Sequence, residues 1–258
     1  MTVGVLCKKS RILGGKDADI KEMPYQVAIK YVHQNILKCG GSIVTDKHIL
    51  TAAHCVATQL YSEMIIIAGT TNLNDILRWT YMIDHADIHP SYTGEMSNNT
   101  VSAYDIAVIT IQGTIVFNEY QNKIDLPTIP YHIGDEAIIS GWGWTTYPAT
   151  NTPALLQTAT VIIVSNEECA DNFEFPICDY HMCTLQLNGI GVCTVSFFIC
   201  LKPLTIMNIF SGDSGGPVVS NGKLIGVISF GVPCATGVPD VHTSIDFNIN
   251  FIRSVINQ

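Results

Sequence analysis

Residues 212–217 read GDSGGP, a run in which Ser214 stands among three glycines. Glycine adopts backbone angles that other residues avoid, so the N–H groups around the serine can turn toward a single point. A developing oxyanion is stabilised where such donors converge. Taken alone, a Gly-Asp-Ser run is most often an ordinary loop, so this stretch indicates chemistry only if partners for the serine occur elsewhere in the chain.

Two other segments supply such partners. Residues 50–55 read LTAAHC and contain His54, and residues 105–108 read DIAV and begin with Asp105. A serine hydroxyl attacks poorly until a base removes its proton, and imidazole has a pKa suited to that task near neutrality. A carboxylate on the other imidazole nitrogen fixes the tautomer and stabilises the imidazolium. The order His54, Asp105, Ser214 makes the three segments together far more specific than each is alone.

Short strand-like runs recur along the chain, separated by Gly, Asn, Asp and Pro clusters at the spacing typical of an antiparallel sandwich or barrel. With 47% hydrophobic residues, the chain has ample material for a buried core. A helical period appears only at the end, where Ile245, Ile249, Ile252 and Ile256 fall on one face. The pattern predicts a mostly-β body with a C-terminal helix, and its strand-like runs are 25–32, 42–44, 64–68, 106–111, 137–141, 158–164, 217–219 and 224–230.

With these motifs the chain resembles the trypsin/chymotrypsin-family serine proteases from Arg11 to its C-terminus. Residues 12–15 (ILGG) resemble the family's mature N-terminus, residues 141–143 (GWG) its mid-chain marker, and residues 229–231 (SFG) the strand that binds the substrate backbone. The resemblance implies an all-β fold of two six-stranded antiparallel β-barrels with a C-terminal helix and the active site between the barrels. His54 and Asp105 would come from the first barrel and Ser214 from the second.

The resemblance also implies a role for each residue. Ser214 would be the nucleophile, His54 the general base and then the general acid, and Asp105 the group that orients His54. The amides of Gly212 and Ser214 would form the oxyanion hole. A lipase or esterase is disfavoured, because its serine sits in a G-x-S-x-G elbow and its triad follows a different order.

Activation by proteolysis is implied as well. The bond between Arg11 and Ile12 resembles the family's activation bond, which a trypsin-like enzyme would cut. The new Ile12 amine would then pair with Asp213 and order the oxyanion loop. We therefore expect residues 1–11 to be a remnant of a signal or activation peptide, and residues 12–258 to form the peptidase domain. Residues 2–6 are apolar but too short for a complete secretory signal.

Nine cysteines without a paired C-x-x-C spacing indicate an oxidising, extracellular compartment. The resemblance implies three disulfides, Cys39–Cys55, Cys169–Cys183 and Cys193–Cys234, the last bracing the specificity pocket. Three cysteines remain over: Cys7, Cys178 and Cys200. An odd number of unpaired thiols is unusual in a secreted protein.

One segment departs from the family pattern. The family's pocket cysteine lies one residue before the glycine of GDSGGP, whereas here the apolar residues 194–211 separate Cys193 from Gly212. Removing residues 195–211 would restore the spacing. Either this stretch is absent from the working protein, as a translated unspliced intron would be, or it is a real insertion that disrupts the oxyanion hole. A harmless surface bulge fits poorly with its apolar character. A protease-like protein that binds partners without cutting them therefore stays open as an alternative.

Substrate preference depends on the specificity pocket. With residues 195–211 discounted, the pocket floor falls on Gly191, which removes the carboxylate that anchors Lys or Arg in trypsin-like enzymes. Gly231 keeps the mouth open, and Ser229 belongs to the strand beside it. These residues predict cleavage after Phe, Tyr, Leu or Met. Asp240 aligns near the back wall, where its carboxylate could admit a basic side chain, or it could be a turn residue pointing away.

Composition and charge exclude other classes. The net charge of −9 and the pI near 5.2 argue against nucleic acid or an anionic membrane as a partner. We expect no cofactor and no metal, since His85 and His89 lack a further evident ligand. We expect the protein to be a monomer. Its expected partners are protein or peptide substrates, an activating trypsin-like protease and proteinaceous inhibitors. Residues 98–100 form a glycosylation sequon just before Asp105.

Overall fold

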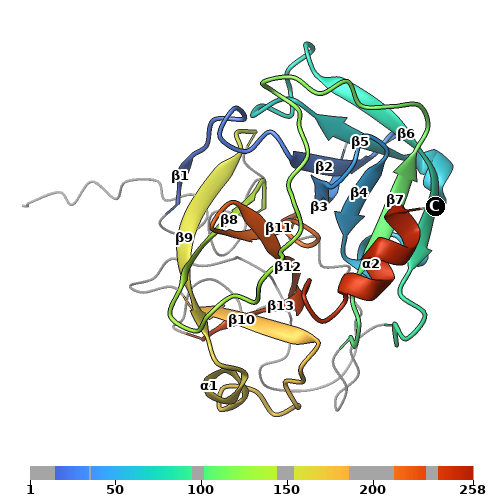
Figure 1. Cartoon of the computed structure of the whole chain (residues 1–258). Coiled ribbons are helices and arrows are strands. Elements are labelled where there is room, and N and C mark those ends of the chain that lie inside the picture. Colours follow the sequence, from blue (N-terminus) through green and yellow to red (C-terminus); the bar gives the residue numbers. More distant parts are fainter. Residues whose placement is uncertain are drawn as a thin grey trace, which may run out of the picture.

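The computed structural model describes residues 15–34, 36–94, 102–143, 154–185, 212–230 and 238–257. Six antiparallel strands close the first barrel in the order β2-β3-β4-β7-β6-β5 (Figure 1). Their bounds are β2 (Gln26–Tyr31), β3 (Leu37–Ile43), β4 (His48–Thr51), β5 (Met64–Ala68), β6 (Trp79–Ile88) and β7 (Ala107–Ile111).

The second barrel closes in the same manner. β8 pairs with both β9 and β11, so the order β8-β9-β10-β13-β12-β11 forms a ring, and the short β1 pairs with the first residues of β9. Their bounds are β1 (Lys16–Asp17), β8 (Glu136–Gly141), β9 (Gln157–Val164), β10 (His181–Leu185), β11 (Pro217–Ser220), β12 (Lys223–Phe230) and β13 (Asp240–Ser244). The expected fold of two six-stranded antiparallel barrels is confirmed.

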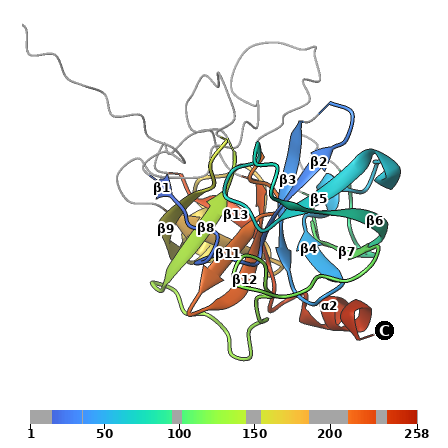
Figure 2. The same cartoon turned by 90° about the horizontal axis from the view of Figure 1, so that it is seen from above.

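The C-terminal helix α2 (Ile249–Ile256) returns to the first barrel, against which it lies in both views (Figure 1, Figure 2). Ile252 and Val255 on α2 join the core cluster of that barrel. Ile245 belongs to the same cluster but precedes the helix, so the predicted helical face begins one turn too early. Among the described residues, no helix reaches the length and apolar character needed to cross a bilayer.

Three shorter helical segments complete the described structure. These are α1 (Asn166–Ala170) and two single-turn 3₁₀ segments, η1 (Ala53–Cys55) and η2 (Tyr61–Glu63). The side chain of Ser165 accepts a hydrogen bond from the Glu168 amide and so caps the start of α1. η1 directly follows β4 and carries His54.

Several strands were missed from the sequence, among them β4, β10 and β13, because their buried positions are not uniformly apolar. On β10 and β13 the side chains of His181, Thr184, Asp240 and His242 are all buried. Thr184 and His242 form a hydrogen bond across the two strands, with 2.8 Å between Oγ1 and Nε2. A buried polar pair of this kind conceals the apolar period on which strand prediction depends.

The two barrels touch backbone to backbone near the middle of the molecule. A Cβ on Gly40 of the first barrel would lie only 3.0 Å from the Cα of Gly216 in the second, so any side chain there would crowd the contact between the barrels. The Gly40 amide donates to the Ser214 carbonyl oxygen at 2.8 Å. Ser140 donates to the side chain of Gln26 across the same contact, at 2.6 Å. The serine turn is therefore held by both barrels.

Candidate active site

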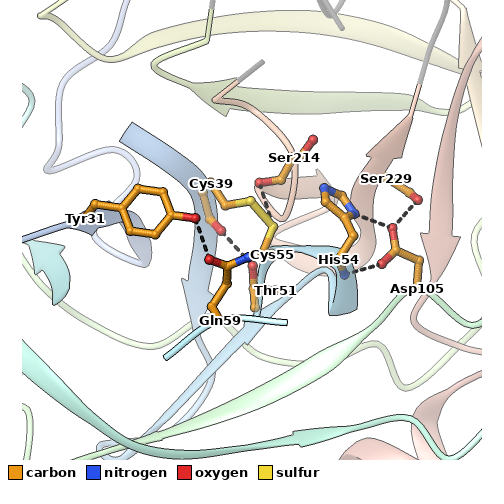
Figure 3. The surroundings of a disulfide bond; sticks show 10 residues. Tyr31, Cys39, Thr51, His54, Cys55, Gln59, Asp105, Ser214 and Ser229 are labelled. Atoms are coloured by element: carbon orange, nitrogen blue, oxygen red, sulfur yellow. Dashed lines mark hydrogen bonds and ion pairs between the residues drawn. A yellow bond between two sulfur atoms is a disulfide. The ribbon is translucent and has the colours of Figure 1, made fainter. Parts of the chain in front are cut away.

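His54 and Asp105 lie side by side because the strands next to them are paired. β4 ends just before His54 and β7 begins just after Asp105, and Thr51 on β4 lies opposite Ala107 on β7. His54 Nδ1 lies 2.7 Å from Asp105 Oδ2, and the His54 backbone N–H donates to Oδ1 at 2.9 Å (Figure 3). Both carboxylate oxygens therefore contact the same histidine, which fixes the imidazole plane.

Asp105 is buried, with 1% of its surface exposed, and residues of the second barrel also form hydrogen bonds with it. The Ser229 hydroxyl donates to Oδ2 at 2.6 Å, and the Thr243 hydroxyl donates to the Asp105 carbonyl at 2.9 Å. Burial alone would raise the pKa of Asp105, but the charge of His54 and the hydrogen bonds from His54 and Ser229 lower it overall. Asp105 is therefore held as a carboxylate.

Ser229 thus has a contact that its predicted place in the substrate pocket did not include. Neither Ser229 nor Thr243 carries a local motif that would mark it as a neighbour of Asp105. Their positions follow from the registers of β12 and β13, where Val227 lies opposite Thr243 and Ile228 opposite His242. Those registers depend on the closed barrel and not on the sequence around each residue.

Ser214 occupies a turn whose glycines are required by their backbone angles. Gly212 and Gly215 have φ values of +80° and +81°, a region that favours glycine. A Cβ on Gly215 would also approach the Gly40 carbonyl oxygen to 2.6 Å. The Gly215 amide donates to Ile228 at 2.7 Å, which ties the turn to β12. The Ser214 carbonyl oxygen lies 3.8 Å from the sulfur of Cys55, the residue after His54, so the serine turn adjoins η1 (Figure 3).

Asp213 explains why the GWG segment carries glycine at both ends. A Cβ on Gly141 or on Gly143 would overlap the Asp213 carboxylate, which packs directly against both residues. The Gly143 amide donates to Oδ1 at 2.7 Å, whereas Oδ2 has no hydrogen-bond partner among the described residues. Burial raises the pKa of Asp213 to about 7. The segments 141–143 and 212–217 therefore form one structural unit around a buried acid.

This acid should make the stability of the uncleaved chain depend on pH. The pKa of Asp213 is about 7 in the folded chain and near 4 in an unfolded one, so its contribution is present below pH 4 and is lost as the pH rises to 7. The loss is at most about 4 kcal/mol, from roughly 1.4 kcal/mol for each pKa unit. Chemical denaturation at several pH values, compared between the wild type and Asp213→Asn, measures it.

The comparison with Asp213→Asn is needed because buried His181 and His242 act in the opposite direction. Burial lowers the pKa of His181 to about 4 and that of His242 to about 3, so both contribute stability that is lost as the pH falls. The difference in unfolding free energy, wild type minus variant, should therefore fall between pH 4 and 7. A constant difference across this window would contradict the prediction.

The structure contains two of the three expected disulfides, Cys39–Cys55 and Cys169–Cys183. The first joins β3 to η1, and its Cys55 sulfur lies 3.8 Å from the Ser214 carbonyl oxygen (Figure 3). Both sulfurs lie close to a ring nitrogen of His54, but their disulfide bond leaves no thiolate there to bind a metal ion. Cys178 is a free, partly exposed thiol. The Cys193–Cys234 pairing, with Cys7 and Cys200, lies outside the described residues.

Some predicted site residues cannot be placed beside this constellation. Arg11, Ile12, Gly191 and Gly231 lie outside the described residues, as do the segment 195–211 and the sequon at 98–100. Asp240 is described: it opens β13, is 6% exposed and lies opposite Thr184 on β10.

The two histidines considered as metal ligands, His85 and His89, contact different neighbours. The ring of His85 lies against the carboxylate of Asp84, with 2.8 Å between Nδ1 and Oδ2. The ring of His89 instead stacks on Tyr104, with 4.6 Å between the ring centroids. The two rings therefore have different partners.

Two antiparallel barrels with a histidine–carboxylate pair beside a serine turn define the class of chymotrypsin-like serine proteases. The trypsin family model matches residues 12–252, and the chain belongs to this family.

The chain is 30% identical to "Cationic trypsin-3" of Rattus norvegicus over 249 residues, covering 95% of this chain and 90% of the relative. It is also 30% identical to "Trypsin-1" of Astacus astacus, covering 94% and 99%. Among solved structures it is similar to neuropsin, a serine protease expressed in the limbic system of mouse brain. That match has a TM-score of 0.80 and 27% identity, and covers 95% of this chain and 99% of the other.

Proposed function

We propose that this chain is a serine endopeptidase that hydrolyses peptide bonds through an acyl-enzyme on Ser214. The observation that carries the proposal is the contact of His54 Nδ1 with the buried carboxylate of Asp105, with Ser214 on a turn whose carbonyl oxygen lies 3.8 Å from the sulfur of Cys55, the residue after His54. With its Nδ1 proton directed to Asp105, the ring presents an unprotonated Nε2 that accepts the Ser214 proton as the hydroxyl attacks the substrate carbonyl.

The carbonyl oxygen becomes an oxyanion, which we assign to the amides of Gly212 and Ser214. His54 then gives its proton to the leaving amine. The C–N bond breaks, the amine departs, and the acyl group remains on Ser214 as an ester. Water attacks this ester by the reverse sequence, with His54 again the base. Asp105 stays ionised throughout, because its hydrogen bonds from His54 and Ser229 favour the carboxylate.

Synthesis as a zymogen is part of the proposal. Cutting the bond between Arg11 and Ile12 would free an amine able to pair with Asp213. Support comes from Asp213 itself, whose Oδ2 is buried and without a partner among the described residues. A buried cation beside it would lower the pKa of the carboxyl from about 7 and fix the serine turn in one conformation. The activating enzyme would be a trypsin-like protease.

Secretion and a monomeric state complete the proposal. Two disulfides suit an oxidising extracellular compartment. The partners are then protein or peptide substrates, the activating protease and proteinaceous inhibitors. Neither a cofactor nor a metal takes part in the proposed reaction.

For specificity we propose cleavage after large apolar or aromatic residues, with Asp240 admitting some Lys and Arg. Asp240 is 6% exposed on β13, in the barrel that carries Ser214. Changing Asp240 to Gly should lower cleavage after Lys and Arg at least about 10-fold and leave cleavage after Phe unchanged, because only basic side chains use the carboxylate. Profiling with a peptide library measures both rates.

Asp240→Asn is the matched control for this test, since it keeps the size of the side chain and removes its charge. It should lose cleavage after Lys and Arg as Asp240→Gly does. Equal cleavage after Lys and Arg in the wild type and both variants would show that the carboxylate points away from the pocket.

A second candidate function is a protease-like protein that binds partners without cutting them. The observation that favours it is the apolar stretch 195–211, which directly precedes the proposed oxyanion donor Gly212. Binding of peptides would survive a distorted oxyanion hole, whereas acyl transfer would not.

A serine-directed phosphonate separates the two functions. The full chain is cut between Arg11 and Ile12, the new N-terminus is verified by sequencing, and the probe is added with Ser214→Ala as control. We expect labelling of the wild type at Ser214 and none of the variant. Correctly cut, folded wild type that stays unlabelled would reject the protease and favour the binding protein.

A further inference from the structure

A column of three stacked rings stands beside the proposed catalytic carboxylate. The Tyr104 ring lies between those of His89 and Tyr180, with 4.6 Å between centroids on each side and interplanar angles of 11° and 26°. Phe251 of α2 meets His89 edge-on at 4.8 Å, and Phe247 lies 6.0 Å from Tyr104. The column therefore joins the first barrel, the second barrel and the C-terminal helix.

The backbone of Tyr104 has a conformation that its residue type disfavours. Its φ is +53°, and within the described residues only Tyr104 and Asn221 combine a side chain with a positive φ. Asparagine tolerates this left-handed region, whereas tyrosine rarely adopts it. The Ile106 amide donates to the Tyr104 carbonyl at 2.8 Å, so Asp105 is the central residue of a tight turn. Such a conformation persists only where surrounding contacts hold it.

The contacts that hold the Tyr104 backbone run from its ring through Tyr180 and β13 back to Asp105. The Tyr180 carbonyl accepts a hydrogen bond from the Ser244 amide at 3.0 Å. The neighbouring residue on the same strand, Thr243, donates its hydroxyl to the Asp105 carbonyl at 2.9 Å. Asp105 is covalently joined to Tyr104, whose ring returns to Tyr180. The stack and the two hydrogen bonds therefore hold the Asp105 turn against one strand of the second barrel.

We infer that Tyr104 is a positioning residue for Asp105. It acts through its ring, which stacks on Tyr180 and keeps the turn in the conformation that places both carboxylate oxygens on His54. The inference rests on the proposed function, because it assumes that Asp105 orients His54 for catalysis. Interbarrel packing alone would predict an effect on stability without an effect on the ionisation of His54.

The decisive variant is Tyr104→Asn, because asparagine accepts the left-handed backbone but supplies no ring. We expect kcat to fall about 10- to 100-fold with KM within about twofold, since small misplacements of a catalytic group have effects of this size. The acid limb of the kcat/KM profile should also differ from that of the wild type, because Asp105 then contacts His54 less closely. Tyr104→Phe keeps the ring and should match the wild type.

Tyr180→Leu removes the ring on which Tyr104 stacks, and it provides the test if Tyr104→Asn does not fold. It should reproduce the lower kcat and the shifted profile. The kcat of the double variant should be no lower than that of the less active single variant, because both changes break the same contact. Unchanged kcat and pH profile in folded Tyr104→Asn and Tyr180→Leu, even with a lower Tm, would overturn the inference and leave the proposed function standing.

A spectroscopic measurement tests the inference without relying on turnover. The His54 Nδ1 proton donated to Asp105 should give a strongly downfield ¹H resonance, present in the wild type and in Tyr104→Phe and weakened or shifted upfield in Tyr104→Asn. If this pattern appears in a correctly cut, folded chain that the phosphonate does not label, the positioning role stands and the protease proposal fails. Absence of the resonance in folded wild type would overturn both.

Discussion

Replacing Asp105 by Asn is expected to lower kcat on the order of 10⁴-fold, the scale known for this exchange in the archetypal triad of the family. The contacts of Asp105 give the reason. Oδ2 accepts from both His54 Nδ1 and Ser229, and Oδ1 accepts from the His54 backbone N–H. An asparagine must direct its NH₂ group at one of these donors.

The orientation that keeps the backbone hydrogen bond places NH₂ against His54 Nδ1. The ring then accepts at Nδ1 and carries its proton on Nε2, so the nitrogen that we propose as the base for Ser214 can no longer accept a proton. The loss should appear in kcat, measured by active-site titration and steady-state cleavage of the activated protein. KM should change little, because Asp105 is 1% exposed and does not reach the substrate.

Ser229→Ala is the matched control for this prediction. It removes one hydrogen bond to Oδ2 but leaves both contacts between Asp105 and His54, so the tautomer is preserved. We expect a loss of about 10-fold, the scale of one hydrogen bond to a charged group. Equal losses in Asp105→Asn and Ser229→Ala would show that the tautomer of His54 is not the determining factor.

The sequence could suggest the three candidate catalytic residues because each lies in a short motif of its own. Ser214, His54 and Asp105 could be proposed from their immediate neighbours and their order, and the two-barrel fold followed from the resemblance. Ser229, Thr243 and Tyr104 could not be linked to Asp105 in this way. Ser229 on β12 donates to the Asp105 carboxylate, Thr243 on β13 donates to the Asp105 backbone carbonyl, and the Tyr104 ring stacks on Tyr180. These contacts depend on strand register and on ring stacking between the barrels.

Asp213 is a second residue whose packing could not be predicted from the sequence. Its predicted partner was the Ile12 amine, a single charge. The structure adds that Gly141 and Gly143 leave the space its carboxylate occupies, so the GWG segment and the serine turn depend on each other. Two motifs some 70 residues apart are therefore one site. No local pattern indicates which side chain fills the space above a glycine.

Deleting residues 195–211 is expected to raise kcat/KM about 100-fold. The serine turn is held from its C-terminal side, where the Gly215 amide donates to Ile228 and the Ser214 carbonyl accepts from Gly40. Gly212 is the first described residue after the segment, and we assign its amide to the oxyanion hole. Loss or displacement of one such donor lowers kcat about 10²- to 10³-fold. By the resemblance of the sequence to the family, the deletion would restore the expected spacing between Cys193 and Gly212.

A linker of Gly and Ser residues with the same length as 195–211 is the control that separates length from apolar character. If length alone displaces Gly212, the linker variant should be as slow as the intact chain, and only the deletion should gain activity. Equal activity of the intact chain and the deletion would identify the segment as a surface bulge. If neither form is labelled at Ser214 after cleavage at Arg11, the binding protein is favoured, because the segment then does not account for the inactivity. Sequencing the transcript across Cys193 and Gly212 decides whether the working protein contains the segment.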